Sequence, residues 1–146
     1  MFIPENLYEQ IIRSMPIPCV DLFVINRSGR VLLLKRRNEP YKGEWWVAGG
    51  RVHVGETRSA AAKRKLFEEC GLQGEPRELS TKDLILFDRH QSVLSHVIAT
   101  IYRVDVDTDV VALDAQHDAA EWRLPSEWID QGVHPYIRGI LLSTVN

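Results

Sequence analysis

The residues best suited to chemistry in this sequence are the carboxylate pair Glu68–Glu69, near the end of a segment with helical spacing. Position 65 lies three and four residues before these glutamates, so on a helix all three side chains project from one side. Clustered carboxylates supply the hard oxygen ligands that Mg²⁺ and Mn²⁺ prefer. Gly49 and Gly50 precede the segment, and a backbone without a Cβ can closely approach a metal ion or a phosphate. The pattern predicts a divalent-metal site that acts on phosphate groups.

Lys65 is the unusual member of this group, because it places a cation where a carboxylate would add a ligand. An ammonium group at short range repels Mg²⁺ by on the order of a few kcal/mol. We therefore expect fewer metal ions than a three-carboxylate site holds, with one ion as the simplest case. Two alternatives stay open: Lys65 points outward along its stem, or Glu68–Glu69 is an ordinary solvated helix face. Counting the bound ions by calorimetric titration tests the single-ion hypothesis.

These residues are positioned by a helix that the sequence predicts over residues 57–70, with Thr57 as N-cap and Gly71 as the C-terminal stop. Residues 19–25 and 30–36 are rich in apolar residues, and the turn sequence NRSG between them predicts a hairpin. The other predicted elements are a strand at WWVAGG (45–50), strands at 83–88, 95–106 and 119–123, and helices at 5–13, from 125 onward and at 134–143. The result is an α+β domain with a mixed sheet, one long central helix and a helix at each end.

Composition and charge limit the classes of protein to which the chain can belong. Its 146 residues suffice for a buried core, and we assign residues 1–146 to a single domain. Eighteen basic and 20 acidic residues give a net charge of −2, which argues against nucleic acid or an anionic membrane as the main partner. The N-terminal residues do not resemble a signal peptide, and no stretch approaches the roughly 20 apolar residues of a membrane span. Two isolated cysteines, Cys19 and Cys70, indicate reduced thiols, so we expect a cytoplasmic enzyme.

The segment GGRVHVGETRSAAAKRKLFEECGL resembles the Nudix box. In family notation this box is Gly, five residues, Glu, seven residues, Arg-Glu, an aliphatic, any residue, Glu-Glu, any residue, Gly and an aliphatic. Residues 50–72 match it at Gly50, Glu56, Arg64, Leu66, Glu68, Glu69, Gly71 and Leu72, whereas Lys65 replaces the first Glu after the arginine. The resemblance implies the Nudix fold, a mixed β-sheet sandwiched between helices (α/β/α), and an internal ion pair between Glu56 and Arg64. It also implies hydrolysis of a nucleoside diphosphate linked to another group, with Mg²⁺, or Mn²⁺ in its place, as cofactor.

The chain is also similar to one branch of this family, the GDP-mannose mannosyl hydrolases. The similarity covers RSMP at 13–16, VDLFV at 20–24, LLLKRRNEP at 32–40, W-x-V-x-GGRV at 45–52 and AQHDAAEWRL at 115–124. In this branch water attacks the anomeric carbon of a nucleotide sugar, and the whole nucleoside diphosphate leaves. The resemblance thus implies that GDP-mannose, or a related GDP-sugar, is hydrolysed to GDP and free sugar. It also implies a homodimer, with the N-terminal segment as an element that two copies can exchange.

The branch resemblance assigns roles to individual positions. The implied metal ligands are Gly49 (through its carbonyl), Glu69 and Gln116, and Glu68 is a further candidate because it stands beside Glu69 on the predicted helix. The implied nucleotide and sugar contacts are Phe2, Ile3, Tyr8, Asp21 and, more weakly, His90. His117 would be the general base, since a neutral imidazole suits that role near neutral pH. Arg36 would bind the departing diphosphate and neutralise its charge with help from Arg51.

Other interpretations of the same residues stay open. His117 alone could be a polar loop residue, and Arg36 and Arg51 could be ordinary surface charges. The chain could instead be an ordinary Nudix pyrophosphohydrolase, in which Glu68 and Glu69 serve attack at phosphorus. Such an enzyme would convert GDP-mannose to GMP and mannose 1-phosphate. Lys65 also allows an inactive nucleotide-binding module, which nucleotides would stabilise thermally without any turnover.

Overall fold

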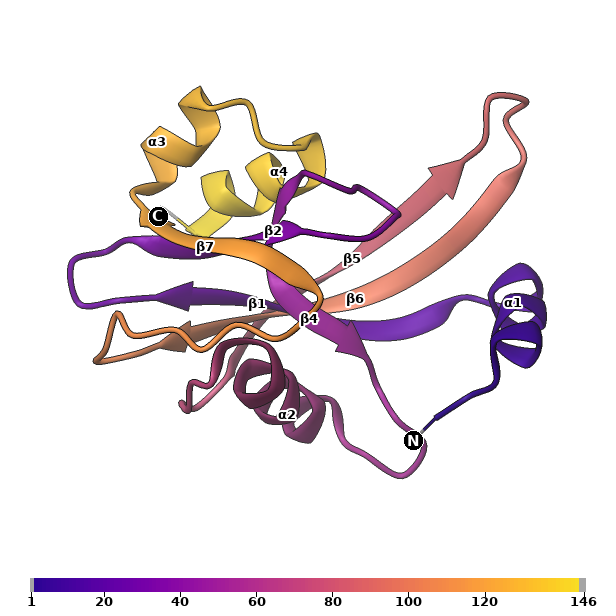
Figure 1. Ribbon diagram of the computed structural model, residues 1–146, viewed down its shortest axis with the longest axis horizontal. Helices are drawn as coiled ribbons and strands as arrows, with labels where there is room; N and C mark the ends of the chain where they lie inside the picture. The colour runs from indigo at the N-terminus through magenta and orange to yellow at the C-terminus, as the bar shows by residue number, and fades with distance from the viewer. Residues whose placement is uncertain (1, 145–146) are drawn as a thin grey trace.

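The predicted strands pair into one mixed sheet in the computed structural model, which describes residues 2–144 (Figure 1). Within these residues the strands are β1 (Ile17–Ile25), β2 (Val31–Arg36), β3 (Trp45–Trp46), β4 (Ala48–Arg51), β5 (Arg77–Phe87), β6 (Val93–Asp105) and β7 (His117–Arg123). The helices are α1 (Glu5–Ser14), α2 (Arg58–Cys70), α3 (Pro125–Asp130) and α4 (Pro135–Thr144). The strand order is β3-β2-β1-β6-β5, with β4 paired to β1 and β7 paired to β2. The sheet is mixed because β1 and β6 run parallel while the other pairs run antiparallel.

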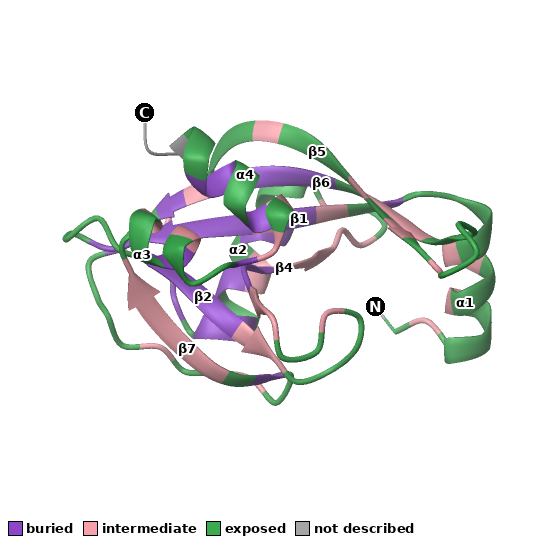
Figure 2. Cartoon of the chain, turned by 90° about the horizontal axis from the view of Figure 1, so that it is seen from above, coloured by how far each residue is buried: buried purple, intermediate pink, exposed green. Residues whose placement is uncertain are grey.

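Side chains of the central strands alternate between two hydrophobic clusters, one on each face of the sheet. On one face α2 packs Leu66 against Leu22, and on the other α3 and α4 pack Trp128 and Ile137 against Phe23. Burial is concentrated in the sheet and on the sides of these helices that face it (Figure 2). The predicted fold class, a mixed sheet sandwiched between helices, is confirmed.

The N-terminal helix lies outside both clusters. α1 packs beside β6 and contains no buried residue (Figures 1 and 2). Its bounds agree with the helix predicted over residues 5–13, and α4 agrees with the helix predicted over residues 134–143. None of the helices within residues 2–144 is long and apolar enough to cross a membrane.

The hairpin predicted over residues 19–25 and 30–36 is only partly right. The two strands are antiparallel neighbours at the turn, but their register pairs only Ile25 with Val31. Farther from the turn, β1 pairs with β4, and β2 pairs with β3 and β7. The composition of a strand predicts its existence but not its partner, and here a later segment replaces the expected neighbour.

The single strand predicted at WWVAGG is divided at Val47, because the chain crosses from one partner strand to another. β3 pairs with β2, whereas β4 pairs with β1. The register of β4 places Gly49 opposite Asp21 and Gly50 opposite Val20. Because α2 packs against β4, the crossing brings both glycines beside the helix that carries the glutamates.

The helix α2 has the two ends that its sequence predicts. The Thr57 hydroxyl accepts a hydrogen bond from the Ala60 N–H at 3.1 Å, and Gly71 ends the helix with a left-handed φ of 67°. Leu66, Glu69 and Cys70 are buried on the side of the helix that faces the sheet. The helix therefore directs one carboxylate, Glu69, inward.

Candidate active site

Glu69 is the carboxylate at the centre of the site. It is only 3% exposed, and its Oε1 accepts a hydrogen bond from the Gly49 N–H at 2.9 Å. A Cβ on Gly49 would lie 2.3 Å from the Val20 carbonyl oxygen, so this approach of β4 to β1 requires glycine. Burial raises the pKa of Glu69, while Lys65, the Gly49 N–H and His117 oppose that rise. Burial is the largest of these effects, so the pKa of Glu69 stays raised, and these three groups offset only part of the cost of its negative charge.

His117 faces Glu69 from the opposite side of the site. It begins β7 at a bulge opposite Arg36, and it is 5% exposed. Its Nδ1 lies 2.7 Å from Asp114 Oδ1, and its Nε2 lies 3.8 Å from Glu69 Oε2. Because a carboxylate accepts hydrogen bonds, Asp114 favours the tautomer with the proton on Nδ1. Asp114 was missed at the sequence level, although a carboxylate three residues before a candidate histidine was a usable signal.

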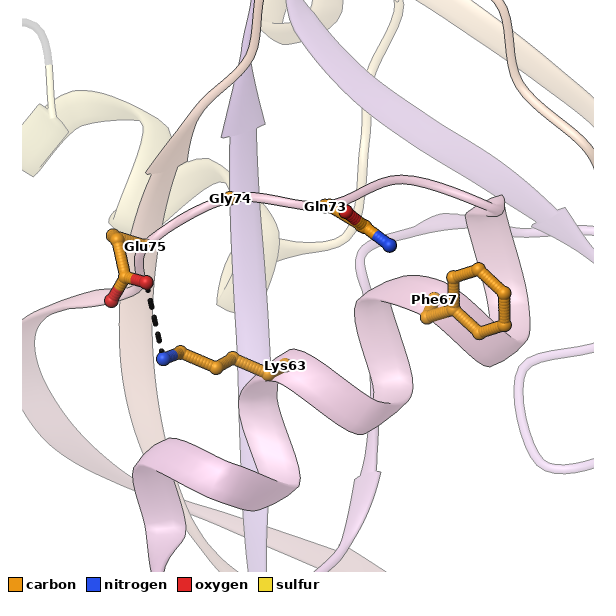
Figure 3. A pocket seen from close by; sticks show the side chains of 5 residues that line it. All are labelled: Lys63, Phe67, Gln73, Gly74 and Glu75. Carbon is orange, nitrogen blue, oxygen red and sulfur yellow. Dashed lines mark ion pairs between the residues drawn. The ribbon is translucent and has the colours of Figure 1, made fainter.

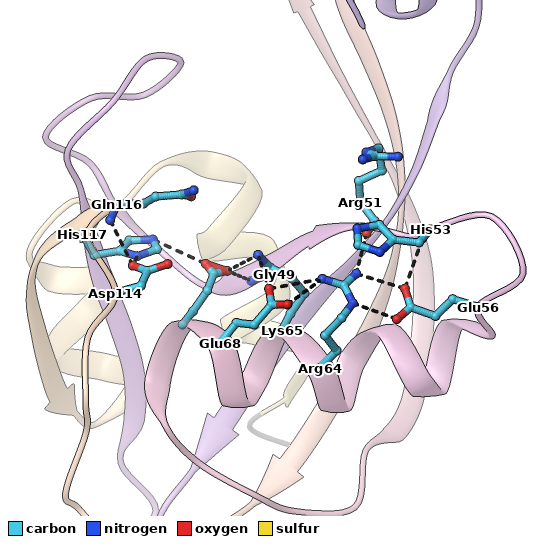
Figure 4. Close-up of polar contacts among 11 residues, drawn as sticks. Gly49, Arg51, His53, Glu56, Arg64, Lys65, Glu68, Asp114, Gln116 and His117 are labelled. Atoms are coloured by element: carbon cyan, nitrogen blue, oxygen red, sulfur yellow. Dashed lines mark hydrogen bonds and ion pairs between the residues drawn. The ribbon is translucent and has the colours of Figure 1, made fainter. Parts of the chain in front are cut away.

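These side chains form a donor set that fits a divalent cation. Ligand atoms of Glu69, Asp114 and His117 all lie within 4.8 Å of one another. The two carboxylates suit Mg²⁺ or Mn²⁺, whereas an imidazole nitrogen is a more usual ligand of transition metals such as zinc. Gln116 is an exposed residue beside His117 (Figure 4). It lines a cavity together with Gly49 and Glu69.

Glu68 and Lys65 behave differently from a simple row of ligands. The Glu68 side chain is 47% exposed and lies 3.2 Å from Arg64 Nη1 and 3.4 Å from Lys65 Nζ. Glu68 does not line the cavity that holds Glu69. Lys65 is turned inward: its side chain is 15% exposed, and its Nζ lies 3.7 Å from Glu69 Oε1 (Figure 4). The alternative that Lys65 points outward is therefore wrong.

The predicted ion pair between Glu56 and Arg64 ties the loop before α2 to the helix. Arg64 Nε donates to Glu56 Oε2 at 2.7 Å, and Arg64 Nη2 donates to Glu56 Oε1 at 3.0 Å. Arg64 Nη2 also donates to the Arg51 carbonyl, and the His53 N–H donates to Glu56. The hydrogen bond from Arg64 is the main reason that the pKa of Glu56 is lowered to about 2.

Replacing Glu56 by glutamine is expected to lower the free energy of unfolding by about 2 kcal/mol near neutral pH. The folded-state pKa of Glu56 lies below its ordinary value of 4.5, so the stabilisation is complete above that pH and is lost as pH falls toward about 2. Urea denaturation of both proteins at about pH 7, 5 and 3.5 measures this convergence, with the exposed Glu75→Gln as control. A difference that does not change with pH would show that lost packing, rather than lost charge, causes the destabilisation.

Two adjoining cavities meet at Glu69. The larger, of about 540 Å³, is lined by Tyr8, Cys19, Arg36, Gly49, Gly50, Arg51, His53, Arg64, Lys65, Glu69 and Gln116. The smaller, of about 160 Å³, is lined by Cys19, Asp21, Arg36, Pro40, Tyr41, Trp46, Val47, Gly49, Gly50, Glu69, Leu84 and Val97. The first gathers cationic side chains that suit a diphosphate, and the second is mainly apolar and aromatic. Arg36, which donates from Nε to the Pro40 carbonyl at 2.7 Å, lines both cavities.

Asp21 lies in the smaller cavity and is held by a residue from α4. Tyr136 donates a hydrogen bond from its hydroxyl to Asp21 Oδ2 at 2.5 Å. Burial raises the pKa of Asp21 to about 6, although Tyr136 and Arg36 oppose that rise. The Tyr136 ring stacks on Trp46, which stacks in turn on Tyr41. Tyr136 was missed at the sequence level, because 115 residues separate it from Asp21 and no local pattern connects them.

The structure gathers some of the other predicted site residues and leaves others apart. Tyr8 lines the larger cavity, and the Arg51 guanidinium lies 5.8 Å from the centre of its ring. Phe2 is 88% exposed, and neither it nor Ile3 lines either cavity. His90 is exposed in the turn between β5 and β6 and also lines neither cavity.

A further cavity, of about 520 Å³, lies between α2 and the loop that follows it (Figure 3). It is lined by Lys63, Phe67, Gln73, Gly74 and Glu75. Lys63 Nζ and Glu75 Oε1 form an ion pair at 3.1 Å. None of these residues lines the two cavities at Glu69, so this region of α2 is separate from the candidate site.

Comparisons with known proteins agree with this arrangement. A family model described as NUDIX domain matches residues 15–140. The low-salt glycan biosynthesis protein Agl8 of Haloferax volcanii is 34% identical over 147 residues, covering 95% of this chain and 88% of that protein. An RNA pyrophosphohydrolase of Roseobacter denitrificans is 26% identical, with 94% of each chain covered.

The solved structure of a MutT NUDIX hydrolase from Burkholderia pseudomallei superposes with a TM-score of 0.75 at 26% identity. The match covers 91% of this chain and all of that one, 100%. The family model spans most of the chain, including the segment that resembles the Nudix box. The chain therefore belongs to the Nudix hydrolase family, and the resemblance of residues 50–72 to the Nudix box is confirmed.

Proposed function

We propose that this chain hydrolyses a nucleoside diphosphate sugar, with GDP-mannose as the first candidate, to the nucleoside diphosphate and free sugar. Water attacks the anomeric carbon, and the carbon–oxygen bond to the diphosphate breaks. The observation that carries the proposal is the pair of cavities, one cationic and one aromatic, that meet at Glu69 and Arg36. Such a pair suits a diphosphate joined to a sugar ring. The name of the Haloferax relative, a low-salt glycan biosynthesis protein, also supports a sugar-linked substrate.

Nudix hydrolases generally use Mg²⁺ or Mn²⁺, and this chain has residues that fit such an ion. We propose that Glu69, Gln116 and the Gly49 carbonyl hold the metal, with Glu68 close by. The buried carboxylate of Glu69 and the packing of β4 that forbids a Cβ at Gly49 support this assignment. When bound, the ion supplies positive charge to the leaving diphosphate. Asp114 and His117 offer further ligand atoms near Glu69.

The remaining proposed roles belong to side chains along the two cavities. Arg36 and Arg51 bind the diphosphate and neutralise the charge that develops as it leaves. Asp21, held by Tyr136, contacts the sugar in the smaller cavity. The nucleotide lies toward Tyr8, at the edge of the larger cavity.

Three of the proposed substrate contacts come from residues that do not line either cavity. They are Phe2 and Ile3, which would extend the nucleotide contact, and His90, which would reach the sugar only if the β5–β6 turn moved toward the site.

A homodimer belongs to the same proposal. The exposed apolar side chains Phe87, Val93 and Leu94 near that turn are available to a second copy.

We propose His117 as the general base that takes the proton from the attacking water. The Asp114 carboxylate holds Nδ1, which leaves Nε2 as the acceptor and fixes it toward Glu69. Glu69 lines both cavities whereas His117 lines neither, so water must approach Nε2 beside the Glu69 carboxylate.

Attack at phosphorus is the competing function, and the RNA pyrophosphohydrolase relative favours it. Glu68 and Glu69 would then act together on the diphosphate. The inward position of Lys65 favours the carbon route. Its ammonium group lies 3.4 Å from Glu68 and 3.7 Å from Glu69 and neutralises part of their negative charge, which leaves less negative charge to bind additional metal ions.

The products of a nucleotide-sugar panel test the proposal. With GDP-mannose and Mg²⁺ we expect GDP and free mannose, and in ¹⁸O-labelled water we expect the label in mannose. Mannose 1-phosphate with GMP, or label in phosphate, would establish attack at phosphorus. Thermal stabilisation by the nucleotides without turnover of any panel member would instead indicate a binding module.

A further inference from the structure

The Lys65 side chain occupies the interior of the site. Its Cε and Nζ would lie 2.7 Å and 3.3 Å from a Cβ on Gly50, so the lysine stem covers the position that this glycine leaves open. Lys65 lines the cavity of about 540 Å³ together with Arg36, Arg51 and Arg64. Lys65 thus projects into the region that the family sequence pattern gives to a metal-binding carboxylate.

The Lys65 ammonium group makes only long contacts with its two carboxylate neighbours. Its distances to Glu68 Oε2 and Glu69 Oε1 are 3.4 Å and 3.7 Å. Both exceed the ~2.7–2.9 Å of short charge-assisted hydrogen bonds, and a lysine carries about three donors. The group therefore has donor capacity for an anion in the cavity while it balances the glutamates.

We propose that Lys65 replaces a second divalent cation of the site and binds the diphosphate of the substrate directly. The inference rests on the proposed function only in requiring a diphosphate, not a particular base, sugar or site of attack. A fixed cation that both neutralises the glutamates and binds the diphosphate explains how the site can work with one metal ion. The position of Lys65 also requires glycine at position 50, because any Cβ there would displace the end of the lysine side chain.

A count of bound Mn²⁺ tests the first half of the proposal. Calorimetric titration and electron paramagnetic resonance should give about one tightly bound ion for the unaltered chain and about two for Lys65→Glu. Lys63→Glu is the matched control, with the same change of charge on the same helix at the separate cavity of Figure 3, and should keep about one ion. Two tight ions in the unaltered chain, or one in a folded Lys65→Glu, would overturn the proposal.

Binding of inorganic pyrophosphate in the presence of EDTA tests the second half. Lys65→Met should weaken this metal-free binding by about tenfold or more, whereas Lys65→Arg should retain it within about threefold. Gly50→Ala should weaken it as well, because the added methyl group displaces the ammonium. Unchanged affinity in a folded Lys65→Met would show that the lysine serves only the glutamates and would overturn direct binding.

These readouts separate this inference from the proposed function. Neither the Mn²⁺ count nor pyrophosphate binding depends on the base, the sugar or the bond that breaks. A product panel that revealed attack at phosphorus would reject the proposed function and leave the role of Lys65 standing. Unchanged pyrophosphate binding by Lys65→Met, together with release of GDP and free sugar by the unaltered chain, would reject the role of Lys65 and leave the proposed function standing.

Discussion

Glu69→Gln is expected to lower kcat/KM by about a thousandfold or more and to weaken Mn²⁺ binding by at least about tenfold. Glu69 lines both cavities, is 3% exposed and is fixed by the Gly49 N–H at 2.9 Å. Glutamine has nearly the same shape and its side-chain oxygen can still accept that hydrogen bond. The substitution therefore removes charge and little else, so the loss measures what the charge does.

Steady-state kinetics and Mn²⁺ calorimetry on the same preparations measure this effect. Glu75→Gln is the matched control, because Glu75 pairs with Lys63 outside the site. Glu68→Gln should have an intermediate effect, since the Glu68 side chain is half-exposed and lies outside the larger cavity. Because burial raises the pKa of Glu69, a neutral residue at position 69 should not destabilise the fold, and urea denaturation checks this. Turnover by Glu69→Gln within about tenfold of the unaltered chain would remove Glu69 from the catalytic machinery.

Local sequence was sufficient for the helix that carries this glutamate. The hydroxyl of Thr57 and the left-handed Gly71 act within one helical turn of the ends that they define, so their residue types alone locate α2. The spacing of Leu66 and Cys70 likewise identifies the buried side of the helix. Glu69 follows Leu66 by three residues and so lies on the same side of the helix, whereas Phe67 and Glu68 are exposed.

Features that depend on contacts distant in sequence could not be predicted. The division of WWVAGG at Val47 arises because β3 and β4 pair with different strands, and composition carries no information about partners. The bond from Tyr136 to Asp21 likewise joins α4 to β1 across the fold. The direction of Lys65 depends on space above Gly50, which exists only once β4 lies beside α2. The sequence therefore predicted most of the candidate residues but not Asp114 or Tyr136, and tertiary packing determined how all of them interact.

His117→Ala is expected to lower kcat by about 10²–10⁴-fold while KM changes by less than about fivefold. The reason is geometric: Asp114 holds Nδ1 at 2.7 Å, so Nε2 is the nitrogen available to accept a proton. Since His117 is buried and its loss removes a partner of Asp114, His117→Gln serves as a second variant that fills more of the space. His96→Ala is the histidine control, because His96 pairs with Asp83 on the β5–β6 hairpin.

Mn²⁺ affinity decides between two explanations of a slow His117 variant. Its Nε2 lies 3.8 Å from Glu69 Oε2 in a group of ligand atoms that could also hold a metal ion. A base contributes to the chemical step alone, so kcat should fall while Mn²⁺ affinity stays within about threefold. If both fall together, His117 is a metal ligand and the base must be another group. In either case Asp114→Asn should change kcat and Mn²⁺ affinity in the same direction as the His117 variants, because an asparagine at position 114 no longer favours the tautomer with an unprotonated Nε2.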